Sequence, residues 1–221
     1  MIVNQKFISQ NLIVAFFAVT LVLIGAEYFS NTSLVFIFKP ILMPLLIALY
    51  WIESRTKCKW YLSALIFAFI SNVLLLFPNT ILLSCGIFAF LFYRIATILA
   101  VIKNGDRVAM LPVTLATIPF LVMFSYPVLT MVSTKDPSFY ATVLNAIIFS
   151  VFSGIGLSSY VMNDNLKNSW LIINTLLSTF LAVIFLFDNF YLSFTIFKPI
   201  SALVFSLSHF ALYCFMMEAE N

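Results

Sequence analysis

The chain alternates between long apolar runs and short polar breaks. Runs of about 20 apolar residues recur from end to end, which is the length of helix that crosses the hydrocarbon core of a bilayer. The longest polar stretches between them, such as ESRTKCK and NDNLKNS, have only seven residues. The pattern predicts eight helices, near residues 7–26, 34–52, 60–77, 80–102, 108–131, 138–161, 169–187 and 191–216.

The composition indicates that lipid, rather than water, surrounds most of the protein surface. Of the 221 residues, 63% are hydrophobic and 9% are charged, against about 25% charged residues in ordinary soluble domains. We therefore expect an all-α, polytopic bundle of transmembrane helices that forms one integral membrane domain over residues 1–221. The first run resembles a signal peptide, but GAEYFSN after it lacks a small-x-small cleavage site, so we interpret it as a retained span.

The distribution of basic residues predicts the orientation. If the N-terminus lies in the cytoplasm, an even number of spans places the C-terminus there too. Seven basic residues then fall in cytoplasmic segments, whereas the outer loops contain one, Lys135. The cytoplasmic residues are Lys6, Arg55, Lys57, Lys59, Lys103, Arg107 and Lys167. All three tryptophans fall at predicted cytoplasmic helix ends, where indoles favour the headgroup zone.

The low-charge composition, rich in Phe, Ile and Asn, favours a bacterial cytoplasmic membrane.

The sequence Ile-Phe-Lys-Pro-Ile occurs twice, with its lysine at Lys39 and at Lys198. Both copies lie near the predicted outer end of a helix that runs inward. A proline in the first turn of a helix costs no hydrogen bond, and a lysine stem can lie along apolar surface while its ammonium reaches the headgroups. This interpretation requires no function, although a shared binding role stays open. The flanking sequences differ too much to indicate a duplicated half.

Four more polar residues lie within predicted spans, where a polar group costs free energy unless it is paired. Arg94 could clamp an anionic headgroup or snorkel to the cytoplasmic headgroups. Asn72 and Thr179 could line a polar pocket or form interhelical hydrogen bonds. His209 could transfer protons or pack as a hydrogen-bonded side chain. The candidate polar pocket therefore comprises Lys39, Asn72, Arg94, Thr179 and His209.

Carboxylates are absent from the middle of every predicted span. All eight map to loops, helix ends or the tail: Glu27, Glu53, Asp106, Asp136, Asp164, Asp188, Glu218 and Glu220. This argues against acid–base hydrolysis by carboxylates and against an ion-coupled transporter. A single histidine and three scattered cysteines predict neither a metal site nor a disulfide framework, and we expect no cofactor.

Two helices carry distinctive small residues or prolines. The row of small residues over Ser150–Ser158 predicts close approach of the sixth helix to its neighbours. Pro112, Pro119 and Pro127 divide the fifth predicted helix and favour kinks there. Such kinks could act as a transporter hinge, or they could be ordinary membrane architecture.

The chain resembles the YhhN-type family of eight-span membrane proteins, which includes lysoplasmalogenases. Lys39-Pro40 followed by ILMPLLIALY is similar to the Lys-Pro opening of that family's second span. SNVLLLF at 71–77 is similar to the end of the third span, and GIFAFLFYRIATI from Gly86 to the fourth. LSTFLAV from Leu177 resembles a second Ser-Asp motif late in the chain. The resemblance implies the eight-span fold and hydrolysis of the vinyl-ether bond of lysoplasmalogens.

The chain departs from the family at the positions that carry this chemistry. Asn72 and Thr179 stand where the family has its supposed catalytic aspartates, and Arg94 stands at its histidine position. Protonation of an enol ether requires an acid, which neither Asn nor Thr supplies. Only Lys39 carries over unchanged, so no catalytic residue is assigned.

These observations favour a divergent YhhN-like protein that binds a lysolipid or similar amphiphile between its helices without carboxylate-driven hydrolysis. An active lysoplasmalogenase-type hydrolase that uses His209 with Arg94 is one alternative. A structural or accessory membrane subunit and a small transporter are the others. We expect membrane lipid as the partner and no nucleic acid.

Overall fold

The computed structural model describes residues 2–106 and 109–220, with side chains from Phe7 onward. Over these ranges the chain forms eight α-helices and no strand, which confirms the all-α expectation. Arg107, one of the basic residues behind the predicted orientation, lies outside the described residues. The helices are α1 (Ile2–Tyr28), α2 (Thr32–Glu53), α3 (Lys59–Leu74), α4 (Thr80–Asn104), α5 (Met110–Met131), α6 (Phe139–Met162), α7 (Leu166–Phe190) and α8 (Phe197–Glu218).

The observed helices follow the predicted ones closely, except at three ends. Helix α1 begins at Ile2 rather than at residue 7. Helix α3 ends at Leu74 rather than at residue 77, because a proline at 78 disfavours helical geometry in the residue before it. Helix α8 begins at Phe197 rather than at residue 191. The residues before it are apolar but not helical, and Pro199 occupies the first turn, where its missing N–H is not needed.

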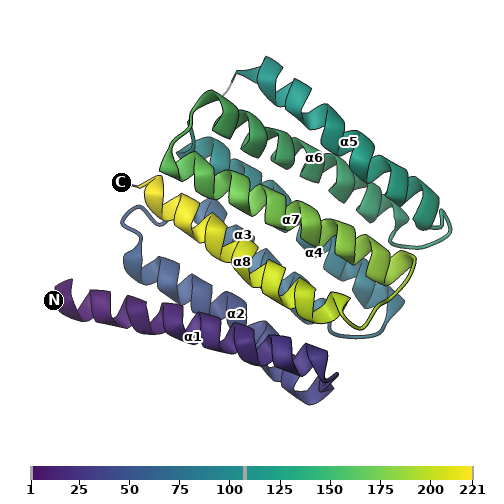
Figure 1. Cartoon of the computed structure of the whole chain (residues 1–221), viewed down its shortest axis with the longest axis horizontal. Helices are drawn as coiled ribbons and strands as arrows, with labels where there is room; N and C mark the ends of the chain where they lie inside the picture. The colour runs from purple at the N-terminus through teal and green to yellow at the C-terminus, as the bar shows by residue number, and fades with distance from the viewer. Residues whose placement is uncertain (1, 107–108, 221) are drawn as a thin grey trace.

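Six helices form a closed ring in the order α2, α3, α4, α6, α7 and α8, in which each helix contacts the next and α8 contacts α2. Helix α1 packs outside this ring against α2 and α8, and α5 packs outside it against α6 and α7. Figure 1 shows α5 and the α1–α2 pair at opposite edges, with α3 and α4 behind α7 and α8. Both chain ends lie at the same end of the bundle, which we name the terminal end; the opposite end is the distal end.

Seven of the described helices are long and apolar enough to cross a membrane, and α3, with 16 residues, is shorter. Large apolar side chains are exposed on every helix, among them Val14, Leu21, Ile118 and Val122. Water would not tolerate such a surface, whereas hydrocarbon does. The protein is therefore a multi-pass membrane protein.

The small-residue row of α6 packs as the sequence predicts. A methyl group added to Gly154 would overlap the Thr117 hydroxyl and approach the Val113 carbonyl oxygen of α5 to 2.9 Å. A methyl group added to Gly156 would overlap the Thr175 hydroxyl of α7. These two glycines allow α5 and α7 to approach α6 on both sides.

The internal prolines lie within continuous helices. Helix α5 extends through Pro119 and Pro127, as the single predicted helix requires, and Pro112 lies in its first turn. Helix α2 begins at Thr32, so Pro40 lies well inside it. The first-turn explanation of the Lys-Pro pair therefore holds for Lys198-Pro199 and is wrong for Lys39-Pro40.

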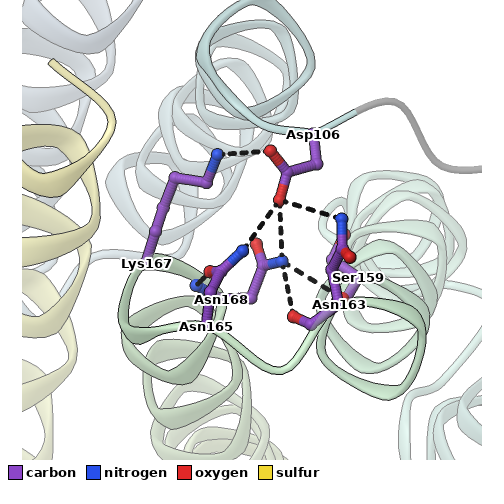
Figure 2. A network of polar contacts seen from close by, with 6 residues as sticks. All are labelled: Asp106, Ser159, Asn163, Asn165, Lys167 and Asn168. Carbon is purple, nitrogen blue, oxygen red and sulfur yellow. Dashed lines mark hydrogen bonds and ion pairs between the residues drawn. The ribbon is translucent and has the colours of Figure 1, made fainter. Parts of the chain in front are cut away.

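Asp106 ties together two connections at the terminal end (Figure 2). Its carboxylate accepts hydrogen bonds from Lys167 Nζ at 2.6 Å, from Asn168 Nδ2 at 3.0 Å and from Asn165 Nδ2 at 3.1 Å. The hydrogen bond from Lys167, with those of the two asparagines, holds the pKa of Asp106 below its ordinary value. The carboxylate thus joins the residues after α4 to the start of α7.

Glu220 makes a second polar contact at the terminal end. It accepts hydrogen bonds from Ser54 Oγ at 2.6 Å, Thr56 Oγ1 at 2.8 Å and the Arg55 backbone N–H at 2.8 Å. Partial burial alone would raise the pKa of Glu220, but these hydrogen bonds together lower it. The residues after α8 are thereby held against the α2–α3 connection.

A pair of glycine variants tests the helix packing. Gly154→Ala should lower the free energy of unfolding by about 1–3 kcal/mol, because the added methyl group meets backbone atoms of α5 that cannot rotate away. Gly25→Ala is the matched control, since a methyl group there has no neighbour within 4 Å. Unfolding of the purified protein in detergent measures both. Equal loss of stability in the two variants would contradict the packing role.

The Asp106 contacts predict a pH dependence. Because its pKa is lower in the folded chain, the stabilisation is fully present above its ordinary value of 3.8 and is lost as the pH falls through the folded-state pKa. Asp106→Asn should cost about 1 kcal/mol or less at pH 7, and this difference should shrink in acid. Unfolding at several pH values measures it, with the exposed Asp164→Asn as the control. A difference that grows in acid would contradict the assignment.

Candidate functional site

One cavity lies between the helices near the distal end, with a volume of about 420 Å³. We name it the distal cavity. All eight helices contribute side chains to it, including Phe124 and Val128, the buried residues of α5. A pocket to which every helix contributes depends on the whole bundle, unlike a groove between two neighbours.

The walls of the distal cavity are mainly apolar, with a few polar groups. Val35, Phe36, Leu83, Phe90 and Phe149 are among the apolar lining residues. The ionisable lining residues are Glu27, Lys39, Arg94, Asp188 and Lys198. Apolar walls with a few placed polar groups are typical of sites for small molecules.

Arg94 is the most deeply buried of these ionisable groups. It lies fourteen residues after Thr80 in α4, about 21 Å along the helix from its distal end. Its side chain is 2% exposed, which excludes snorkelling to the cytoplasmic headgroups. A helical side chain leans toward the N-terminus of its helix, and for α4 that is the distal end, so Arg94 faces the cavity that it lines.

Aromatic rings surround the Arg94 guanidinium. The Cζ atom lies 4.2 Å from the ring centre of Phe149, 4.8 Å from Phe90, 5.1 Å from Tyr93 and 5.5 Å from Phe152. Cation–π contacts of this kind stabilise a buried positive charge in part. Among the described residues, Nη1 finds no hydrogen-bond acceptor and Arg94 forms no ion pair.

Asn72 places a second unused donor on the same cavity. It lies near the distal end of α3, is buried, and its Nδ2 has no acceptor among the described residues. Neighbouring polar groups are used differently. Ser71 Oγ donates to the Gly86 carbonyl at 2.9 Å, and Asn145 Nδ2 donates to the Ile87 carbonyl at 2.9 Å, which fixes α3 and α6 to α4.

Glu27 was misjudged from the sequence. It lies in the last turn of α1, as expected, but it is only 8% exposed and lines the distal cavity. Its Oε1 lies 3.5 Å from Lys39 Nζ. The expectation that every carboxylate stands apart from a buried site is wrong for Glu27, because the α1–α2 connection folds it against Lys39.

Both Ile-Phe-Lys-Pro-Ile copies contribute their lysine to this one cavity. Lys39 follows the α1–α2 connection and Lys198 follows the α7–α8 connection, and each preceding helix carries a carboxylate in its last turn, Glu27 or Asp188. Asp188 accepts a hydrogen bond from Ser193 Oγ at 2.6 Å. The two hairpins thus present the same pair of groups to the cavity, because α8 packs against both α1 and α2.

The remaining two candidates lie elsewhere. Thr179 and His209 are not among the residues that line the distal cavity. His209 Nδ1 lies 2.9 Å from the Phe205 carbonyl oxygen, and its ring stacks on Tyr93 with centres 5.2 Å apart. Of the five residues expected in one pocket, the fold brings together Lys39, Asn72 and Arg94.

Sequence reasoning missed several polar residues of the site. Glu27, Asp188 and Asn145 line the cavity but lie at helix ends or look like packing residues in the sequence. An acid ten or twelve residues before each Lys-Pro pair was the available signal. Among the described residues, no group of His, Cys, Asp and Glu side chains could hold a metal ion.

The arrangement can hold a molecule with an apolar part and an oxygen acceptor. The apolar walls suit hydrocarbon, while Arg94 and Asn72 offer buried donors. Comparison with known proteins adds no assignment, since no family model, no curated protein and no solved structure matches the chain.

Proposed function

We propose that this protein binds a single-chain amphiphile, such as a lysolipid, in the distal cavity without carboxylate-driven hydrolysis. One observation carries the proposal: a cavity of about 420 Å³ between eight helices combines apolar walls with the unpaired buried donors of Asn72 and Arg94. An unpaired buried donor costs free energy that a bound oxygen acceptor removes. A hydrocarbon chain fills the apolar part.

The proposal includes membership of the YhhN-type family in a divergent form. The eight-helix layout and the lysine at Lys39 support it. We also propose that both termini face the cytoplasm of a bacterium, as the basic residues favour. The distal cavity then opens toward the outer leaflet of the cytoplasmic membrane.

A second candidate function is a hydrolase of the lysoplasmalogen type. The burial of Glu27 in the distal cavity favours it, because a carboxylate next to a bound ligand could act as a general acid. The contact with Lys39 weighs against it, since Lys39 Nζ lies 3.5 Å from Glu27 Oε1 and competes with a ligand for that oxygen. The version that relies on His209 loses its support, because His209 does not line the cavity.

Blocking the cavity tests the binding proposal. Ala146 of α6 lines the cavity, whereas Ile147 beside it is exposed. Ala146→Trp should fill part of the cavity and reduce a co-purifying amphiphile by about tenfold, equivalent to ~1.4 kcal/mol. Ile147→Trp, the matched control, should leave it unchanged. Mass spectrometry of lipids extracted from the purified proteins measures the effect. Recovery of bulk lipids alone, in their bulk proportions, would count against the proposal.

An aldehyde-release assay separates the two candidate functions. We expect purified protein to release no aldehyde from a lysoplasmalogen above an empty-membrane control, since Asn72 supplies no acid. Release that is lost in Glu27→Gln and kept in Glu218→Gln would favour the hydrolase instead. Glu218 is a suitable control because it lies at the end of α8, on the terminal end of the bundle.

A further inference from the structure

We propose that the ligand enters the distal cavity acid first and places a negatively charged carboxylate or phosphate group against Arg94. This inference rests on the proposed function and adds the chemical class and the direction of the ligand. Its basis is Arg94, a lining group that is 2% exposed, forms no ion pair and has no acceptor for Nη1 among the described residues.

The charges of the cavity leave Arg94 unbalanced. The ionisable lining residues comprise three cations and two carboxylates, so one positive charge is in excess. Lys39 lies 3.5 Å from Glu27, and Asp188 and Lys198 lie in the last turn of α7 and the first turn of α8. Arg94 is thus the cation with no carboxylate beside it among the described residues, and one negative charge on the ligand would neutralise the cavity there.

Arg94 needs an acceptor that the rings do not provide. The faces of Phe149 and Phe90 attract the guanidinium charge, but the N–H groups of arginine still require oxygen acceptors. Carboxylate and phosphate oxygens match the guanidinium fork and form charge-assisted hydrogen bonds. A neutral hydroxyl or ester would leave the buried charge uncompensated.

The depth of Arg94 determines the direction of the ligand. The guanidinium lies about 21 Å into α4, whereas Lys39 lies only about 10 Å into α2, and Glu27, Asp188 and Lys198 lie in the last or first turns of their helices. A ligand that entered tail first would press hydrocarbon against a buried charge. With the acid at Arg94, the chain lies along Leu83 and Phe36 toward the distal end, and Asn72 offers a second donor on the way.

A set of matched amphiphiles tests this inference on the full-length protein in nanodiscs of phosphatidylcholine. The acidic probes are palmitate and palmitoyl lysophosphatidic acid, and the neutral probes are hexadecanol and 1-palmitoylglycerol. Inorganic phosphate and acetate test the acid without a chain. We expect both chain-bearing acids, or one of them, to bind at least about tenfold more tightly than the neutral probe of equal chain length. The preferred acid identifies a carboxylate or a phosphate ligand.

Three variants locate the effect. Arg94→Met should abolish the preference for acids, Arg94→Lys should keep part of it, and Arg55→Met, on an exposed loop residue, should not change it. The thermal midpoint of ligand-free Arg94→Met should match or exceed that of the unsubstituted protein, because the variant removes an unpaired buried charge. A purely structural arginine would instead give a lower midpoint. Arg94→Lys keeps the test decisive if Arg94→Met fails to fold.

The outcomes separate this inference from the proposed function. Equal binding of acidic and neutral probes, or a preference that survives in Arg94→Met, would overturn the acid-first assignment and leave amphiphile binding intact. Binding of phosphate or acetate as tight as that of the long-chain acids would support the anion site and overturn an amphiphile as its ligand. No binding of any probe would overturn both proposals.

Discussion

The chemistry of the distal cavity depends on one buried positive charge. Arg94 lies in hydrocarbon-like surroundings between aromatic rings, with no carboxylate beside it among the described residues. Burial of an unpaired ion in such surroundings costs several kcal/mol of free energy. Cation–π contacts with the rings offset only part of this cost. Around it, α3 and α6 are joined to α4 by hydrogen bonds to the carbonyl groups of Gly86 and Ile87. A ligand that supplies an acceptor for Arg94 would therefore lower the free energy of the site.

The α1–α2 and α7–α8 hairpins bring the two copies of Ile-Phe-Lys-Pro-Ile to the same cavity. The first Ile-Phe-Lys-Pro-Ile copy lies inside α2 and the second spans the start of α8. Each of these helices follows a turn after a helix end that carries a carboxylate. Contact of α8 with α1 and α2 brings both lysines to one cavity although 158 positions separate them. The pairs are not equivalent, since Lys39 and Glu27 form an ion pair while Asp188 accepts a hydrogen bond from Ser193. The cavity lining therefore contains one ion pair, Lys39 with Glu27, whereas Arg94 has no carboxylate beside it among the described residues.

The polar contacts are divided between the two ends of the bundle. At the terminal end, Asp106 and Glu220 accept several hydrogen bonds each and join connections that are distant in the sequence. Asn72 near the distal end and Arg94, about 21 Å into α4, keep donors unused at the cavity. Satisfied networks make a structure rigid, and an unsatisfied buried donor gains from a ligand that supplies its acceptor. The Asp106 and Glu220 contacts therefore lie apart from the donors that a ligand would use.

The number, type and approximate limits of the helices followed from the sequence, because long apolar runs in lipid have few other ways to satisfy their backbone. The same local rules picked out Lys39, Asn72 and Arg94 as polar groups in apolar runs. Which of them meet depended on helix contacts between distant segments, and these excluded His209 and Thr179 from the cavity and added Glu27 and Asp188. A residue at a helix end looks the same in sequence whether its turn faces water or folds inward. Only the packing of the eight helices decided that Glu27 is buried beside Lys39 and that Arg94 has no partner.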